Sequence, residues 1–162
     1  MSRFSVVGST AAALLLISEV KRKNFGLTLD LGHSLMAGEN PAQSVAMATR
    51  AGKLFGVQFN DMYQRTGAED GLAVASVNPR MVLEVVHWLR RADWDGICYF
   101  DTFPMNENPV REGEMNIRTI TKMWQKAGGN ARTLLSISFL RFFTIHPSIF
   151  PHSLVDSFSG TD

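Results

Sequence analysis

A short apolar segment followed by a helical segment occurs three times in this chain, and this order restricts the possible folds more than any other feature. The apolar segments are Leu27–Leu31, Phe55–Asp61 and Ile97–Asp101, and we predict that each is a β-strand. Short apolar runs of this kind are typical of parallel strands that are covered on both faces. Strands that alternate with helices predict parallel βα units, and therefore an α/β fold built as a doubly wound sheet or a (β/α) barrel.

Capping residues, prolines and the spacing of apolar residues predict the helices around these strands. The predicted helices are Thr10–Lys23, Ala42–Leu54, Arg80–Ala92 and Val110–Ala127. The polar segment Met62–Asn78 is predicted to be a long functional loop, with a short strand at Leu72–Val77 as an option.

The composition fits one globular domain and argues against several classes of partner. The chain has 162 residues and a formal net charge of +1, which provides no basic surface for nucleic acid. Cys98 is the single cysteine, so neither an internal disulfide nor a cysteine-rich zinc site can form, as is typical of the reducing cytoplasm. The apolar stretches 4–18 and 133–140 are shorter than the ~18 residues of a membrane helix. We therefore expect a cytoplasmic protein without nucleic-acid or membrane partners.

No nucleotide-binding motif follows any of the predicted strands. Neither the fingerprint G-x-G-x-x-G nor the P-loop G-x-x-x-x-G-K-[ST] occurs in the sequence. The glycines of these motifs let the backbone approach a phosphate closely, so we do not expect a nucleotide cofactor.

The C-terminal end of the chain differs in character from the rest. Residues 133–162 are rich in Ser, Phe and Ile, and no helical or strand period persists through them. No acidic residue occurs between Glu114 and Asp156, whereas the preceding part of the chain is balanced in charge. We predict a folded domain over residues 1–130 and an irregular tail over residues 131–162.

Polar side chains lie at the C-terminal end of each predicted strand. Asp30 and His33 follow the first strand, Gln58 and Asp61 lie at the end of the second, and Asp101 ends the third. In parallel βα folds these strand ends meet at one site. Carboxylate and imidazole groups together suit a divalent cation, and the lack of further cysteines argues against a structural zinc. The pattern predicts a cation site at this end of the sheet.

Each of these residues also has an ordinary structural explanation. An Asp after a strand is commonly a helix N-cap or a turn residue, and an isolated His is commonly a hydrogen-bonded, partly buried side chain. Glu69 and Asp70, in the long loop, are either solvated charges or ligands of a second cation. Both interpretations stay open at this point.

Several segments of the chain resemble, in order, successive blocks of one known superfamily. These segments are Leu29–Pro41, Lys53–Asp61, Glu69–Val77 and Tyr99–Pro104. They resemble the xylose-isomerase-like sugar isomerases and epimerases, in particular the L-rhamnose isomerase branch. The resemblance extends from about residue 4 to residue 127. It implies an incomplete (β/α)8 TIM barrel, with the last three strand–helix units, a preceding helix and the irregular C-terminal tail.

The resemblance also implies a metal-dependent sugar isomerase that interconverts aldoses and ketoses with one or two divalent cations. Mn²⁺ is the first expectation, with Co²⁺ or Mg²⁺ as alternatives. By motif position, Asp30 and Asp101 resemble ligands of the more tightly held cation, and His33 resembles a ligand near the catalytic one. His33 and Asp101 are thus the expected catalytic residues. Glu69 and Asp70 lie in the region that supplies further ligands of the second cation.

The sequence departs from the family pattern in ligand type and in length. Gln58 stands where the family commonly has a histidine ligand, and an amide oxygen favours Mg²⁺ or Mn²⁺ over softer ions. Asn60 and Asp61 are expected to orient the site through hydrogen bonds. A complete barrel takes about 250 residues, and the family's ligating glutamate would precede Phe4. We therefore expect an N-terminally truncated barrel, for which enzymatic activity of the chain itself stays open.

Other functions are compatible with the same residues. A sugar epimerase or an inosose-type dehydratase would use the same barrel and the same cation site. A metal-dependent endonuclease acting on abasic DNA would need a basic groove, which a net charge of +1 does not provide. A non-catalytic remnant would use the strand-end carboxylates only as caps. In the leading interpretation the partner is a small sugar, and the full-length family members are expected to be homo-oligomers.

Overall fold

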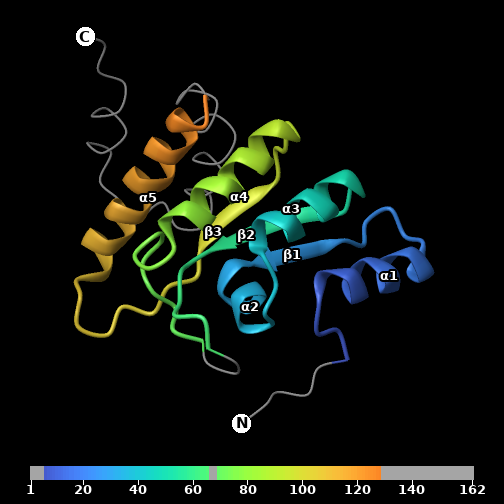
Figure 1. The fold of residues 1–162 in the computed structure, drawn as a ribbon, viewed down its shortest axis with the longest axis horizontal. Coiled ribbons are helices and arrows are strands. Elements are labelled where there is room, and N and C mark those ends of the chain that lie inside the picture. Colours follow the sequence, from blue (N-terminus) through green and yellow to red (C-terminus); the bar gives the residue numbers. More distant parts are fainter. Residues whose placement is uncertain (1–5, 66–68, 129–162) are drawn as a thin grey trace.

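The computed structural model describes residues 6–65 and 69–128, which form a parallel three-stranded sheet with helices packed along it (Figure 1). The strands are β1 (Leu27–Asp30), β2 (Leu54–Phe59) and β3 (Ile97–Phe100). The helices are α1 (Thr10–Val20), α2 (Leu31–Met36), α3 (Pro41–Arg50), α4 (Pro79–Arg91) and α5 (Pro109–Lys126). The predicted α/β class and the parallel strands are confirmed. The predicted tail, residues 131–162, lies outside the described residues.

One face of the sheet and the helices α3, α4 and α5 enclose the hydrophobic core. Leu29 of β1 and Val57 of β2 are neighbours in the parallel register and are both buried. The helices contribute small and branched apolar side chains, which let helix and sheet approach closely. The buried core members from α3, α4 and α5 are Ala42, Val45, Ala48, Val82, Val85, Val86, Leu89, Ile120 and Trp124. This packing holds the sheet and fixes the direction of its C-terminal edge.

The opposite face of the sheet is only partly covered by the described residues. Parallel register places Thr28, Gly56 and Ile97 side by side on this face, followed by Gln58 and Tyr99 one step nearer the C-terminal edge. Ile97 and Tyr99 are 47% and 38% exposed. The expectation that both faces of the strands are covered therefore holds for one face only within this part of the chain.

Two local predictions are wrong. The first predicted strand, Leu27–Leu31, ends at Asp30, and helix α2, which is not among the predicted helices, begins directly after it. The Asp30 side chain accepts a hydrogen bond from the His33 N–H and caps this helix. The optional strand at Leu72–Val77 does not form. Leu72 makes a single antiparallel bridge with Asp61, and the left-handed backbone of Ala75, with φ of 62°, is incompatible with a continuing strand.

Two predicted helices are shorter than expected, for reasons that lie in the backbone. Helix α1 ends at Val20 because Lys21 adopts φ of 53°, and its N–H bonds the Ile17 carbonyl. Helix α3 ends at Arg50, and Gly52, with φ of 64°, turns the chain into β2. None of the described helices has the length and apolar character needed to span a bilayer.

The long loop between β2 and α4 is packed against the segment that follows β3. The Phe103 N–H donates to the Gly71 carbonyl at 2.7 Å. Gly71 has φ of 56°, and a methyl group at this position would overlap the Phe103 ring. Glycine is therefore required at position 71 both by its backbone conformation and by this contact.

We expect Gly71→Ala to destabilise the chain more than Gly38→Ala. Gly38 also has a positive φ, of 74°, but no atom lies within 4 Å of where its methyl group would be. Gly38→Ala should therefore lower the free energy of unfolding by about 1 kcal/mol, from backbone strain alone. Gly71→Ala should lower it by about 2–4 kcal/mol, because the Phe103 ring must also move. Urea unfolding measured by circular dichroism tests this difference. Equal losses would contradict the close packing of the loop.

Candidate metal centre

Asp30 ends β1 and is the buried member of the candidate centre, with 6% of its surface exposed. Its Oδ1 accepts from the His33 N–H at 2.8 Å, and both of its carboxylate oxygens lie 3.2 Å from Nδ2 of Asn60. The Asn60 side-chain oxygen in turn accepts from the Gly32 N–H at 2.8 Å. Asn60 therefore fixes both the Asp30 carboxylate and the first turn of α2. This is the hydrogen bonding that the sequence predicts for Asn60.

His33 and Glu69 complete a cluster with Asp30. The first turn of α2 carries His33, whose Nε2 lies 2.9 Å from Oε1 of Glu69 in the long loop. One ligand atom from each of the three residues lies within 4.8 Å of the others. Two carboxylates and one imidazole are a donor set that fits a small divalent cation, so the residues present are compatible with the expected metal.

Burial raises the pKa of the Asp30 carboxyl above its ordinary value. The hydrogen bonds from the His33 N–H and from Asn60 oppose this effect, as does the charge of His33, whereas the charge of Asp101 adds to it. The folded chain therefore disfavours the ionised form of Asp30. A bound cation would favour that ionised form, which is what a metal ligand must be.

The ends of β2 and β3 bring Gln58 and Asp101 together beside this cluster. Gln58 is the register neighbour of Asp30 on one side and of Tyr99 on the other. Its Nε2 donates to Oδ2 of Asp101 at 2.8 Å. Asp101 is not a member of the compact three-residue cluster, but its charge influences the pKa of Asp30. The structure therefore places Gln58 and Asp101 as a hydrogen-bonded pair at the same sheet edge.

The two adjacent loop carboxylates have different environments. Asp70 accepts from the Tyr63 N–H at 2.9 Å and from the Arg65 guanidinium, whereas Glu69 contacts His33. Of the two, Glu69 joins the cluster, and Asp70 holds the loop to its own first residues. The sequence leaves this choice open because both carboxylates lie in one polar loop.

Tyr99 is a residue of this edge that the sequence reasoning missed. Partial burial and the charges of Asp101 and Asp30 raise the pKa of the Tyr99 hydroxyl. The available signal is the period of a strand, because Tyr99 precedes Asp101 by two residues and so lies on the same face of β3.

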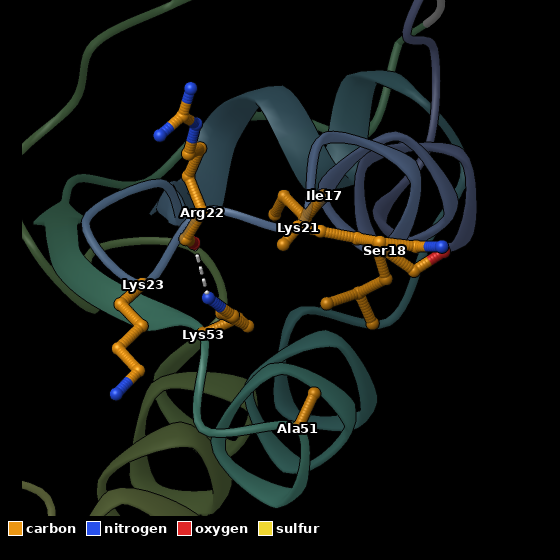
Figure 2. Close-up of a pocket in the computed structure, with 8 residues that line it drawn as sticks. Ile17, Ser18, Lys21, Arg22, Lys23, Ala51 and Lys53 are labelled. Atoms are coloured by element: carbon orange, nitrogen blue, oxygen red, sulfur yellow. Dashed lines mark hydrogen bonds between the residues drawn. The ribbon is translucent and has the colours of Figure 1, made fainter.

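A basic pocket of about 330 Å³ lies at the other end of the strands, between α1 and the turn before β2 (Figure 2). The Lys53 ammonium group is bound by the carbonyls of Arg22 and Phe25 at 2.9 and 3.1 Å. Figure 2 shows the Arg22 and Lys23 side chains extending in different directions. These cations do not converge on one point, so the pocket has no geometry for holding an anion.

The raised pKa of Asp30 predicts a pH-dependent effect of Asp30→Asn on stability. A group with a raised pKa stabilises the fold fully below its unfolded pKa, and this contribution is lost as the pH rises through the folded pKa. Asn retains the capping oxygen but carries no charge. The amide of Asn would also lose one of the two contacts with the Asn60 NH₂ group, a loss that does not depend on pH. We therefore expect the stability of Asp30→Asn relative to the unsubstituted chain to be higher at pH 7 than at pH 4. Urea unfolding at both pH values measures this difference, and a relative stability of Asp30→Asn that rises on acidification would contradict the assignment.

Comparison with known proteins is consistent with this architecture. Residues 1–126 match the family described as xylose isomerase-like TIM barrel. The xylose isomerase of Thermus thermophilus is 31% identical over 132 residues, which are 82% of this chain and 31% of that protein. The xylose isomerase of Thermus caldophilus is 30% identical over 132 residues, with the same coverage. The chain thus spans 31% of the length of these curated relatives. It belongs to the xylose isomerase-like TIM-barrel family, and its three strand–helix units are part of such a barrel.

Proposed function

We propose that the chain provides the cation-holding edge of a metal-dependent sugar isomerase, which interconverts an aldose and a ketose. Asp30, His33 and Glu69 hold the divalent cation, for which Mn²⁺ is the first choice. The single observation that carries this proposal is the convergence of their ligand atoms within 4.8 Å of one another.

The side chains around the cluster have separate roles in this proposal. A bound divalent cation would polarise the carbonyl group of the sugar and so favour hydrogen transfer between the two neighbouring carbons. Asn60 keeps the Asp30 carboxylate turned towards the cluster through its two contacts at 3.2 Å. Asp101, oriented by Gln58, presents its second oxygen at the same edge. It is available as a further ligand or as a group that binds the sugar.

The carboxylate and imidazole groups of the cluster and the sequence similarity of the chain to xylose isomerases support an isomerase. The two relatives are xylose isomerases, and the sequence resembles the L-rhamnose isomerase branch. Both aldoses are therefore candidate substrates. A cavity of about 610 Å³ lies between the long loop and the start of α5, but none of the three cluster residues lines it, so the proposal does not rest on this cavity.

We expect the purified chain to bind Mn²⁺ and Glu69→Gln to weaken that binding by about 10-fold or more. Substitutions of the residues around a metal typically cost about 10–100-fold in affinity, and a lost charged ligand costs at least as much. The matched control is Glu84→Gln, the same chemical change at an exposed position of α4, which should bind as the unsubstituted chain does. Isothermal titration calorimetry measures the affinities.

The outcomes separate the cation site from the reaction. Absence of Mn²⁺ binding would contradict the proposal. Asp30 would then act only as a helix cap, and His33 and Glu69 would form only a surface pair. Ketose formation from L-rhamnose or D-xylose that stops when the cation is removed would support isomerase activity. Mn²⁺ binding without ketose formation from either aldose would leave the cation centre supported and the isomerase activity unsupported.

A further inference from the structure

Asp61 is a fully buried carboxylate outside the cluster, and none of its side-chain hydrogen bonds is to a cluster residue. Its Oδ1 accepts from the Met62 N–H at 2.8 Å and from the Asn78 side-chain amide at 2.7 Å. Its Oδ2 accepts from the backbone N–H groups of Val77 and Asn78 at 2.8 and 2.7 Å. Both oxygens are thus satisfied, by donors from the two ends of one loop.

The backbone of Asp61 holds the middle of the same loop. Its N–H donates to the Leu72 carbonyl at 2.9 Å, and its carbonyl accepts from the Leu72 N–H at 2.8 Å. One residue therefore closes the loop of residues 62–78 at its beginning, at Leu72 and at its end.

The side chain of Asn78 bonds to Asp61 and Met62 instead of capping its own helix, which is a second observation that the two ends of the loop are held together. Asn78 precedes Pro79 at the start of α4, yet it makes no side-chain capping hydrogen bond. Asn40 and Asn108, which precede Pro41 and Pro109 in the same way, do cap α3 and α5. A cap is typically worth about 1 kcal/mol. Asn78 instead uses its amide to bond Asp61 and the Met62 carbonyl, at 2.7 and 2.8 Å.

Glu69 lies inside the segment that Asp61 closes, three residues before Leu72. Its carboxylate reaches Nε2 of His33 at 2.9 Å. We propose that Asp61 is a positioning residue that latches the long loop, so that affinity for a divalent cation depends on a carboxylate that contacts neither the cation nor its ligands. This inference rests on the proposed function of the Asp30, His33 and Glu69 cluster.

Asp61→Asn is the sharpest variant because it keeps the size of the side chain. An amide has only one acceptor oxygen. Its NH₂ group would replace the other oxygen and would face the N–H groups from which that oxygen now accepts hydrogen bonds. Buried donors left without an acceptor are costly, so the ends of the loop should separate. The matched control is Asp95→Asn, the same change at an exposed position in the turn before β3.

Two measurements on the full chain test the latch. In Mn²⁺ titrations, Asp61→Asn should weaken binding by about 10-fold or more, whereas Asp95→Asn should not. Adding Asp61→Asn to Glu69→Gln should change the affinity by less than about twofold, because the latch acts through Glu69. In hydrogen exchange, which needs no metal, the amides of Leu72, Val77 and Asn78 should exchange faster in Asp61→Asn.

The two measurements separate a failure of the role of Asp61 in holding the loop from a failure of the cation site. Unchanged exchange in Asp61→Asn would overturn the latch whatever the chain does with Mn²⁺. Unchanged affinity, or an equal loss in the Glu69→Gln background, would overturn the link between the latch and the cation. If the unsubstituted chain binds no Mn²⁺, the proposed function fails and with it this link, and the exchange rates alone decide whether Asp61 holds the loop.

Asn78→Ala keeps the test decisive if Asp61→Asn does not fold. It removes the two side-chain bonds to Asp61 and Met62 and leaves the backbone donors of the latch in place. We expect a smaller loss of Mn²⁺ affinity than in Asp61→Asn, again absent in the Glu69→Gln background. Unchanged exchange and affinity in Asn78→Ala would overturn the latch.

Discussion

The hydrogen bonds of Asn60 and Asp61 are the interactions on which the candidate centre depends. These two residues follow β2 in the middle of the sheet, and their side chains are almost completely buried. Asn60 binds the Asp30 carboxylate and the start of α2, whereas Asp61 binds the long loop. The central strand thereby holds both parts of the cluster, because its neighbours in space belong to segments that are distant in sequence.

The position of Asp30 between the sheet and α2 makes its ionised carboxylate unfavourable. The core under the sheet and the first turn of α2 remove water from the carboxylate, which raises its pKa. The partners that oppose this effect are neutral amides and one half-exposed imidazole, and they leave the carboxylate without a full counter-charge close by. A site that favours function over stability has this character, because a bound cation would offset the cost of the buried charge.

Much of the fold could be predicted from the sequence because it depends on local signals. The strands are short apolar runs, and Asn40-Pro41 starts α3 as the capping pattern predicts. The errors occur where backbone conformation depends on a distant contact or on a residue type that rarely adopts it. Ala75 in the left-handed region and the immediate start of α2 after Asp30 are examples. Likewise, the sequence could identify the loop that supplies a ligand, but it could not choose between Glu69 and Asp70, because that choice depends on contacts with Arg65 and His33.

The sequence by itself determined the order of the strands and of the described helices other than α2, the family, and the set of polar residues at the strand ends. These follow from periodicity, capping and motif order, which are properties of neighbouring residues. Only the tertiary structure decided which of the polar residues meet. In the folded chain, Asp30 and His33 lie close to Glu69, and Gln58 donates a hydrogen bond to Asp101. The Asp61 carboxylate accepts hydrogen bonds from the long loop. The physical reason is that hydrogen bonds and ligand geometry act over a few ångströms in space, whereas the groups they join lie up to 43 residues apart in the chain.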